Sequence, residues 1–451
     1  MSNHLSISEM SKKTSRTLSL KTLEKDSSSV NIDSDSQTLL VTAPTPDATL
    51  ATAILSRALI RLNRRFQVTF VQPVMTLEAL SELRTKYDSS TIVVIGIDIL
   101  GSKKIKKGKR PLILIGGILE SEQLNTFTLG NDATLIPAAY TLAKSLIDTV
   151  SYDLQLAVAG VLIHDKLNVS KKGASREILD LAEKEGLIEE RKGFRLFGVG
   201  MLPLDETFLY CTYPYFHTIS GNQRACDELL IASEIPVQKL RQPLNALNAS
   251  EAQRLTSQLI TRLDPEIISL LLGKDYLLKL ERESSPLRYI SGVEIVANTA
   301  WVRNELGASM SVWLGDRGLA LRVLIDTHMS HHKDVISSVQ RLDAGLMGES
   351  TSSATILKIP GSKTEVLPDV GRIALSNRLV NPDRPLVLDN TEFYTIVWPF
   401  SRFGTKQIIR ELLKKDILTF ASSSQSVTIN HNPEMKETAL QLISTIDKVG
   451  G

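Results

Sequence analysis

The chain has 451 residues, of which 42% are apolar, so it is long enough to form about two or three domains with sizeable cores. Its 52 basic and 50 acidic side chains give a net charge of +2, which excludes a uniformly basic nucleic-acid coat. Two cysteines are too few for a disulfide scaffold, and no apolar run reaches the roughly 18 residues that a membrane span needs. These features predict a cytoplasmic protein that does not enter a membrane.

Residues 1–37 are rich in Ser, Lys, Asp and Thr and include the run Ser27-Ser28-Ser29. Such a segment buries too little apolar surface to offset the entropy cost of ordering it. We therefore expect a disordered tail, followed by a folded part that begins at Thr38.

From Thr38 onward, predicted strands alternate with predicted helices, which is typical of a parallel sheet covered by helices. The strands are 38–43, 67–71, 91–97 and 112–115, and the helices are 50–62, 77–83 and 135–146. The segment 154–163 is apolar and ends at His164-Asp165. Because ligands of such sheets bind beyond the carboxyl ends of the strands, we expect several strand-end residues to converge there. They are Asp47, Asp98, Ile115-Gly116-Gly117 and Asp165.

Helical patterns dominate after Gly173 and continue through 226–286, which we interpret as a helical connector. A second α/β unit is predicted for 287–451, with strands at 311–314, 320–325, 354–359, 372–375, 385–388, 395–399 and 427–429. The predicted organisation is a tail (1–37), an α/β domain with a parallel sheet (38–225), the connector (226–286) and a second α/β domain (287–451).

Three histidines, His328, His331 and His332, stand at spacings that put them on one helix face, as zinc ligands often are. No cysteine or fourth ligand lies nearby in the sequence. We therefore interpret these histidines as the exposed start of a helix rather than as a metal site.

The segment Gly173-Ala-Ser-Arg-Glu-Ile-Leu179 leads through Lys192-Gly-Phe-Arg-Leu-Phe-Gly198 to Tyr213-Pro-Tyr-Phe216 and Ile219-Ser-Gly-Asn222. In order and spacing, these segments resemble the DHH phosphoesterase superfamily. Within it they resemble the archaeal RecJ-like branch, which includes GINS-associated nucleases and the replication factor Cdc45. The resemblance extends from Thr38 to the C-terminus, and it implies a DHH-type domain first and a DHH-associated domain last.

Active members of this superfamily hold two divalent ions, usually manganese, which activate a water molecule and stabilise charge on the phosphate. The resemblance places the first ligand motif on residues 43–48, where Asp47 is the one carboxylate. It places the second motif on Asp98 and the fourth on Asp165. The third, Asp-His-His in active members, falls on Ile115-Gly116-Gly117, whose side chains cannot bind a hard cation.

We therefore predict no catalytic residue, no resident metal and no cofactor. The vestigial metal-site positions are Asp47, Asp98 and Asp165, and the degenerate motif positions are Ala43, Thr45, Ile115, Gly116 and Gly117. Asp47 also fits the role of a helix cap, and Asp98 that of a turn residue at a strand end. A single weakly held magnesium or manganese ion stays open.

Active relatives bind nucleic acid through the second domain, with an Asn-Ala-Cys-Gly-Arg helix start and a Gly-Gly-His loop. The resemblance puts these motifs on 298–302 and 421–426, where larger side chains replace the glycines. A separate basic run follows Asp98, and it can bind single-stranded DNA or an acidic partner, or be a merely solvated loop. It consists of Lys103, Lys104, Lys106, Lys107, Lys109 and Arg110.

The resemblance implies a catalytically inactive component of the archaeal replisome, which binds the GINS complex and activates or stabilises the MCM helicase. Single-stranded DNA is a further candidate partner. Two alternatives stay open, namely an active metal-dependent RecJ-like single-strand exonuclease and a small-nucleotide phosphodiesterase. For both enzymes, manganese is expected to stimulate hydrolysis and Asp98→Ala to abolish it.

Overall fold

The structure, a computed structural model, describes residues 18–30, 32, 36–101, 110–120, 126–164, 172–343, 348–351, 353–399 and 404–449. The chain divides into two compact units. Unit 1 consists of residues 1–189, 278–280 and 306–320, and unit 2 of residues 190–277, 281–305 and 321–451. The main change of unit thus falls at residue 189, whereas the sequence suggested a change near residue 225.

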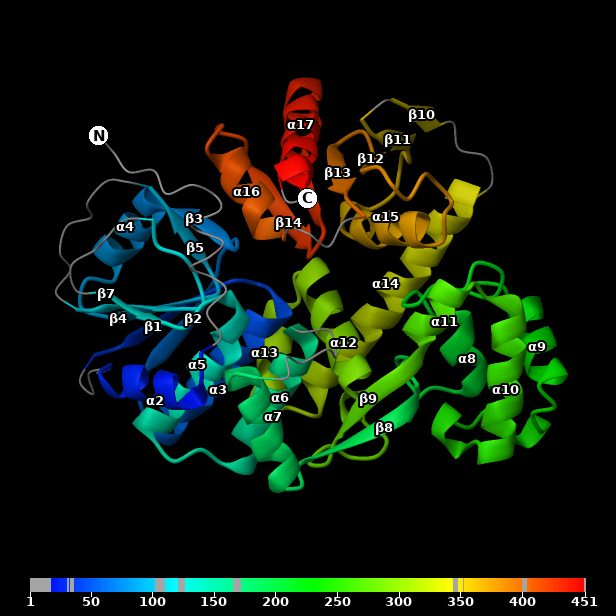
Figure 1. The fold of residues 1–451 in the computed structure, drawn as a ribbon, viewed down its shortest axis with the longest axis horizontal. Helices are drawn as coiled ribbons and strands as arrows, with labels where there is room; N and C mark the ends of the chain where they lie inside the picture. Colours follow the sequence, from blue (N-terminus) through cyan, green and yellow to red (C-terminus); the bar gives the residue numbers. More distant parts are fainter. Residues whose placement is uncertain are drawn as a thin grey trace. The chain divides into compact units, whose positions relative to one another are not determined.

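Unit 1 is built on a five-stranded parallel sheet with the strand order β2-β1-β4-β6-β7 (Figure 1). Its strands are β1 (Thr38–Thr42), β2 (Phe66–Phe70), β4 (Thr91–Ile95), β6 (Leu112–Ile115) and β7 (Thr126–Leu129). Every residue of β1, β4 and β6 is buried, as expected for central strands of a covered parallel sheet. The predicted α/β class with an N-terminal parallel sheet is confirmed.

Helices α3 and α5 pack on this sheet, and α2, α6, α7 and α13 pack around these two helices. The helices are α2 (Leu20–Ser28), α3 (Pro46–Arg61), α4 (Leu77–Lys86), α5 (Leu135–Leu146), α6 (Ser151–His164), α7 (Ala174–Lys184) and α13 (Leu306–Leu314). A parallel pair, β3 (Val74–Thr76) and β5 (Asp98–Leu100), packs against α4. The strand order reverses between β1 and β4, which makes their carboxyl ends the topological switch point, where ligands of such sheets bind.

Unit 2 contains a six-stranded mixed sheet with the order β10-β11-β12-β13-β15-β14, in which β11 and β12 are parallel. Its strands are β10 (Gly348–Ser350), β11 (Thr355–Lys358), β12 (Leu386–Asp389), β13 (Phe393–Val397), β14 (Thr419–Ser423) and β15 (Ser426–Asn430). The helices associated with this sheet are α12 (Ile290–Val302), α14 (Leu319–Asp343), α15 (Leu367–Ser376), α16 (Thr405–Leu413) and α17 (Pro433–Val449). Helices α14 and α15 share an apolar core with β11, β12 and β13.

A second core in unit 2 is helical. It joins α8 (Leu204–Leu209), α9 (Gln223–Ala232), α10 (Ala249–Arg262) and α11 (Pro265–Leu271) around the buried rings of Phe208 and Phe216. The predicted connector therefore contains helices, but it also contains strand β9 (Leu272–Leu278), which pairs with β8 (Ile188–Phe194). No helix in the described part of the chain is both long and apolar enough to cross a bilayer.

Three segments predicted as strands are helical. Residues 311–314, 320–325 and 372–375 lie in α13, α14 and α15. Each is a short, mostly apolar segment, and the periodicity of such a segment does not distinguish a strand from a buried helix. The longer sequence around each segment distinguishes the two. In α14, for example, the buried side chains of residues 319–343 recur at helical spacing throughout.

The expectation of disorder throughout residues 1–37 is wrong for residues 20–28, which form α2. Leu23 and Ser27 lie one helical turn apart on the same face, and both are buried. Composition could not reveal this helix, because α5 and α7 supply most of the apolar surface against which it packs.

Candidate functional site

The switch point of unit 1 is filled by small apolar residues of the chain itself. A Cβ atom added to Gly96, at the end of β4, would lie 2.9 Å from the Cβ of Ala48 and 3.8 Å from that of Ala43. Gly96 also has a φ of +68°, which side chains rarely tolerate. Ala43, one of the degenerate motif positions, is fully buried. The ends of β1 and β4 therefore pack directly on the start of α3.

The third motif position is closed by neighbouring atoms. Ile115 ends β6 and is fully buried. A Cβ atom on Gly116 would lie 2.8 Å from the Cβ of Leu135, and on Gly117 it would lie 2.2 Å from the carbonyl oxygen of Ile97. Both separations are shorter than van der Waals contact allows. Residues 115–117 thus have no metal ligand and leave no room for one at the two glycines.

Asp98 begins β5 and is 2% exposed. Its Oδ1 accepts a hydrogen bond of 3.1 Å from the backbone N–H of Ile118, and its own N–H donates to the carbonyl oxygen of Pro73 at 3.0 Å. The carboxylate therefore fastens the turn after β6 to the start of β5. This is the structural role of a strand-end turn residue.

Asp47 lies in the first turn of α3, where the helix dipole favours a negative charge. Its Oδ1 accepts hydrogen bonds from Thr45 Oγ1 at 2.6 Å and from the N–H of Ala48 at 2.9 Å. Its Oδ2 lies 2.9 Å from Nδ1 of His164, the last residue of α6. The carboxylate thus links the helix start to α6.

The pair of Asp47 and His164 was missed by sequence reasoning. The only signal was the position of His164 at the end of an apolar segment, beside Asp165. Asp165, the vestigial position of the fourth motif, lies outside the described residues. The structure therefore brings Asp47 to His164, and it places Asp98 in a separate contact with the turn after β6.

The donor set does not fit the paired manganese ions that the family resemblance implies. Among the residues that the structure describes, no three His, Cys, Asp or Glu side chains are grouped so that they could hold a metal ion. Carboxylate or imidazole donors are required for such ions. At residues 115–117 they are replaced by main chain and apolar atoms, and Asp47 and Asp98 already bind other groups.

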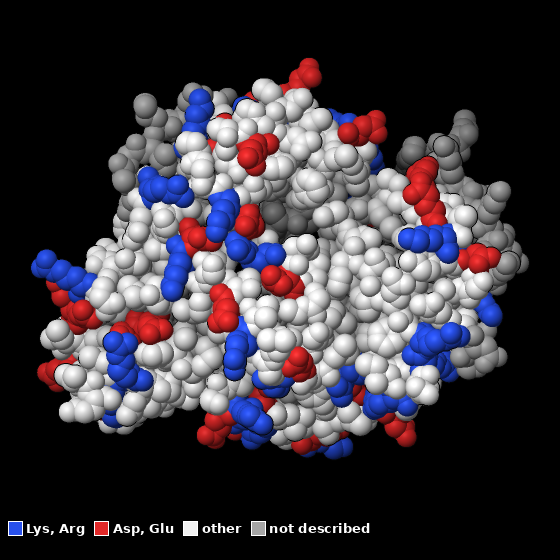
Figure 2. Space-filling model, turned by 180° about the vertical axis from the view of Figure 1, so that it is seen from behind, with Lys and Arg blue, Asp and Glu red and all other residues white. Residues whose placement is uncertain are grey.

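The basic run falls mostly outside the described residues, since Lys103, Lys104, Lys106, Lys107 and Lys109 all do. Arg110 is described, is half-buried, and its carbonyl oxygen accepts a hydrogen bond from Arg84. On the face drawn in Figure 2, the described basic and acidic side chains are interspersed. That part of the surface does not form a broad field of one sign.

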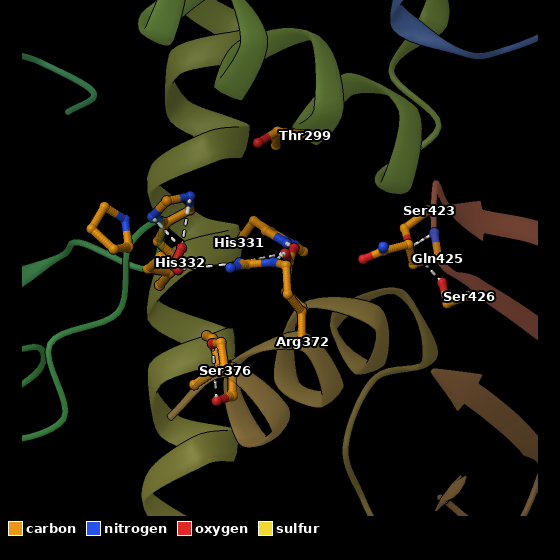
Figure 3. Close-up of polar contacts among 12 residues, drawn as sticks. Thr299, His331, His332, Arg372, Ser376, Ser423, Gln425 and Ser426 are labelled. Carbon is orange, nitrogen blue, oxygen red and sulfur yellow. Dashed lines mark hydrogen bonds and ion pairs between the residues drawn. The ribbon is translucent and has the colours of Figure 1, made fainter. Parts of the chain in front are cut away.

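The two nucleic-acid motif positions of the second domain lie in unit 2. Residues 298–302 form the end of α12 and not a helix start, so that expectation is wrong. Residues 421–426 form the hairpin of β14 and β15, whose turn is closed by hydrogen bonds among its own residues (Figure 3). Ser423 Oγ lies 2.7 Å from Ser426 Oγ and accepts from the N–H of Gln425 at 3.2 Å. The side chains of this turn therefore bind one another and the main chain of the turn.

The three histidines are buried in the middle of α14, so the expectation of an exposed helix start is wrong. His328 and His331 are 1% exposed and His332 is 6% exposed. Figure 3 shows His331 beside Arg372 of α15, and both bind the carboxylate of Asp369, at 2.8 and 2.9 Å. Sequence reasoning missed their burial because the histidines and their polar neighbours interrupt the apolar pattern of the helix. The buried residues Leu324, Val335 and Val339 belong to that pattern.

Burial lowers the pKa of two histidines in this cluster. It lowers the pKa of His328 well below the usual value and that of His332 to about 4, with a smaller contribution from the neighbouring histidines. Burial alone would raise the pKa of Asp369, but the hydrogen bond from His331 and the charge of Arg372 hold it well below its usual value. The cavity beside His328 and His332 has a volume of about 10 Å³, which is room for one water molecule and not for a substrate.

No protein-family model and no curated protein matches the chain. Among solved structures, Cdc45 from Entamoeba histolytica matches with a TM-score of 0.57 and 11% sequence identity, over 93% of this chain and 96% of that chain. RecJ from Thermus thermophilus, in complex with Mn²⁺, matches with a TM-score of 0.48 and 12% identity, over 95% of this chain and 56% of that chain. The match to Cdc45 confirms the predicted fold: this chain has the fold of Cdc45.

Proposed function

We propose that this chain is a catalytically inactive, Cdc45-like component of an archaeal-type replisome, which binds the GINS complex and activates or stabilises the MCM helicase. The similarity of fold to Cdc45 over nearly the whole of both chains supports this proposal. The observation that carries it is the packing of Gly116 and Gly117 against Leu135 and Ile97. That packing replaces a metal-binding motif by a closed structural contact.

The chemistry of the remaining side chains supports the same proposal. Two-metal hydrolysis needs several carboxylate or imidazole donors around ions about 4 Å apart. Asp98 is instead bound to the N–H of Ile118, and Asp47 to Thr45, Ala48 and His164. These residues connect elements of unit 1, so their role in the proposal is to maintain a scaffold.

The proposal of GINS and MCM as partners rests on the family resemblance. The basic run suggests single-stranded DNA as a further partner. Six cations within eight residues can neutralise several phosphates, and each neutralised phosphate releases a counterion. For a chain in which Lys103, Lys104, Lys106, Lys107 and Lys109 are replaced by Ser, the slope of log K against log salt for single-stranded DNA should become shallower. GINS binding should not change. An unchanged slope would show that these lysines do not bind the phosphates of single-stranded DNA.

The first experiment tests for hydrolysis. The purified full chain is incubated with manganese and labelled single strands, with an active RecJ as positive control. We expect no cleavage and no change of melting temperature on adding manganese. Cleavage that disappears in Asp98→Ala would establish the exonuclease or phosphodiesterase instead, whereas cleavage that persists in Asp98→Ala comes from a contaminant.

The second experiment tests assembly. The tagged full chain is mixed with purified GINS and MCM, and the complex is isolated by size-exclusion chromatography. We expect coelution with GINS, and a rise in MCM helicase activity when both are present. Asp98→Asn, which keeps an acceptor oxygen for Ile118, should assemble as well as the wild type because catalysis plays no part. A folded chain that does not bind GINS would refute the proposal.

A further inference from the structure

Strand β2 is an open edge of the parallel sheet in unit 1. It pairs with β1 on one side, and among the described residues no strand pairs with its other side. All five residues of β2 are at least partly exposed, whereas every residue of β1 is buried. The opposite edge strand, β7, packs against α2. Main-chain N–H and C=O groups along β2 are therefore available to a further strand.

The sequence of β2 does not protect this edge. Proteins usually guard an edge strand with a proline, a charged side chain or a bulge. The run Phe-Gln-Val-Thr-Phe at 66–70 contains no proline and no charge, and its register with β1 is continuous. The exposed Arg65 precedes the strand. These properties favour the addition of a strand to β2.

The side chains of β2 form a pattern that is symmetric about its central residue. Successive side chains point to opposite faces, so Phe66, Val68 and Phe70 share one face, and Gln67 and Thr69 share the other. Read in either direction, the order is aromatic, polar, aliphatic, polar, aromatic. A strand with this order is complementary to a second copy of itself that runs in the opposite direction.

We propose that β2 pairs with β2 of a second copy of this chain, antiparallel and about a two-fold axis at Val68, so that the two sheets join. The opposed pairs are then Phe66 with Phe70 of the partner subunit, Gln67 with Thr69 of the partner subunit, and Val68 with Val68 of the partner subunit. This is an isologous interface, in which both copies use the same surface. The inference does not rest on the proposed function.

The side-chain pairs fix the register of this interface. Aromatic side chains stabilise each other across neighbouring strands, and so do an amide and a hydroxyl that can form a hydrogen bond. A shift by one residue would place Phe66 opposite Thr69 of the partner subunit, and the apolar face of one strand would meet the polar face of the other. The symmetric register is therefore the favoured one.

The charges beside β2 permit the pairing. In the symmetric register, Arg65 lies opposite Val71 of the partner subunit, and the two arginines are six strand positions, or about 20 Å, apart. That separation exceeds the Debye length of about 8 Å at physiological ionic strength, so their repulsion is largely screened. Two five-residue strands bury less than the roughly 1,200 Å² of a standard interface, so we expect a weak dimer.

A charge exchange in the full chain tests the register. Gln67→Lys/Thr69→Lys and Gln67→Glu/Thr69→Glu each place like charges opposite one another, so each variant alone should stay monomeric. An equimolar mixture places lysine opposite glutamate in both pairs and should dimerise at least about tenfold more tightly than either variant alone. Sedimentation velocity between about 1 and 100 μM, the range of a weak interface, measures the association.

The matched control is Gln253→Lys/Ser257→Lys, which adds the same two charges at exposed positions of α10 and should dimerise as the wild type does. A wild-type chain that is monomeric at about 100 μM would overturn the proposal. A dimer that persists in both β2 variants alone, or a mixture of folded variants that stays monomeric, would overturn it as well.

Hydrogen exchange on the unmodified chain gives a second measurement, which decides the question if a β2 variant does not fold. Some amides of β2 should exchange at least about threefold more slowly at 100 μM than at 1 μM, and those of β7 should not change. Equal rates in β2 at both concentrations would contradict the pairing. Protection of β2 that appears only when GINS is added would assign the edge to GINS, and that too would overturn the proposal.

Discussion

At the scale of single residues, Asp98 shows how a position that the family resemblance marks as a vestigial metal site serves the fold. Its carboxylate is 2% exposed and accepts the N–H of Ile118. Asp98→Ala should lower the free energy of unfolding by about 1–3 kcal/mol, because the part-buried N–H of Ile118 loses its partner. Asp98→Asn keeps an acceptor oxygen and should lose less. Urea denaturation checks both values, and equal losses for the two variants would refute the hydrogen-bonding role.

The buried histidines make stability depend on pH. For His332 the pKa is about 4 in the folded chain, against 6.5 in the unfolded chain, because burial disfavours the charged ring. Below pH 6.5 the unfolded chain binds more protons, so stability is fully present above that pH and is lost as the pH falls towards 4. The loss from His332 amounts to roughly 3 kcal/mol at the acid end.

Melting temperatures measured between pH 4 and pH 8 check this dependence. His332→Gln should flatten the curve below pH 6.5, because one titrating group is removed from the buried cluster. His217→Gln, which replaces a histidine at an exposed position, serves as the matched control. A curve for His332→Gln that runs parallel to the wild type would show that the cluster does not govern acid stability.

At the scale of elements, the two glycines after β6 decide whether the ligand motif that the family resemblance implies could be built there. Gly117→Ala would place a Cβ atom 2.2 Å from the carbonyl oxygen of Ile97, so the main chain would have to move. We expect a loss of at least about 2 kcal/mol. Gly307→Ala in α13 meets nothing within 4 Å and should be neutral or stabilising by up to about 1 kcal/mol.

Thermal and urea unfolding of both glycine variants measures this difference. Since Gly116 and Gly117 are both closed, the double variant Gly116→His/Gly117→His should be destabilised and should gain no manganese-dependent cleavage. A stable double variant that binds manganese would show that the site has merely lost its ligands and has kept its space.

The elements that sequence predicted correctly are those with one dominant local signal. Strands β1, β4 and β6 are continuous apolar runs that end at Pro, Gly or Asp, and α5 was predicted with its observed limits. Parts of helices α13 and α15 were predicted as strands, since a run of three apolar residues satisfies either period. Their helical state depends on packing against distant segments, such as α3 in the case of α13.

The candidate site was predictable to the same degree. The location of Asp47 and Asp98 beyond strand ends follows from the alternating pattern of a parallel sheet. The contact of Asp47 with His164 joins residues 117 positions apart, and no local pattern encodes it. The closeness of Gly117 to Ile97 is likewise a property of the turn geometry, so the sequence indicated missing ligands but not the closed space around them.

At the scale of the whole molecule, the two units are interleaved along the sequence. Residues 306–320, far from the N-terminal segment, belong to unit 1 because α13 packs on α3 and Arg57 donates to the carbonyl oxygen of Leu314. Trp313 of α13 is 2% exposed. A cut of the chain between α12 and α13 would therefore remove part of the core of unit 1, and no single cut point separates the two units.

Two tryptophans, one in each unit, test this division in the full chain. Trp313→Ala should destabilise unit 1 by about 3–5 kcal/mol, because it leaves a large cavity beside α3. Trp398 is 1% exposed, and Trp398→Ala should destabilise unit 2 by a similar amount. Hydrogen exchange resolves the units: Trp313→Ala should speed exchange in α3 and α6 and spare α15, and Trp398→Ala should do the reverse. Faster exchange in both units with either variant would mean that they unfold as one cooperative body.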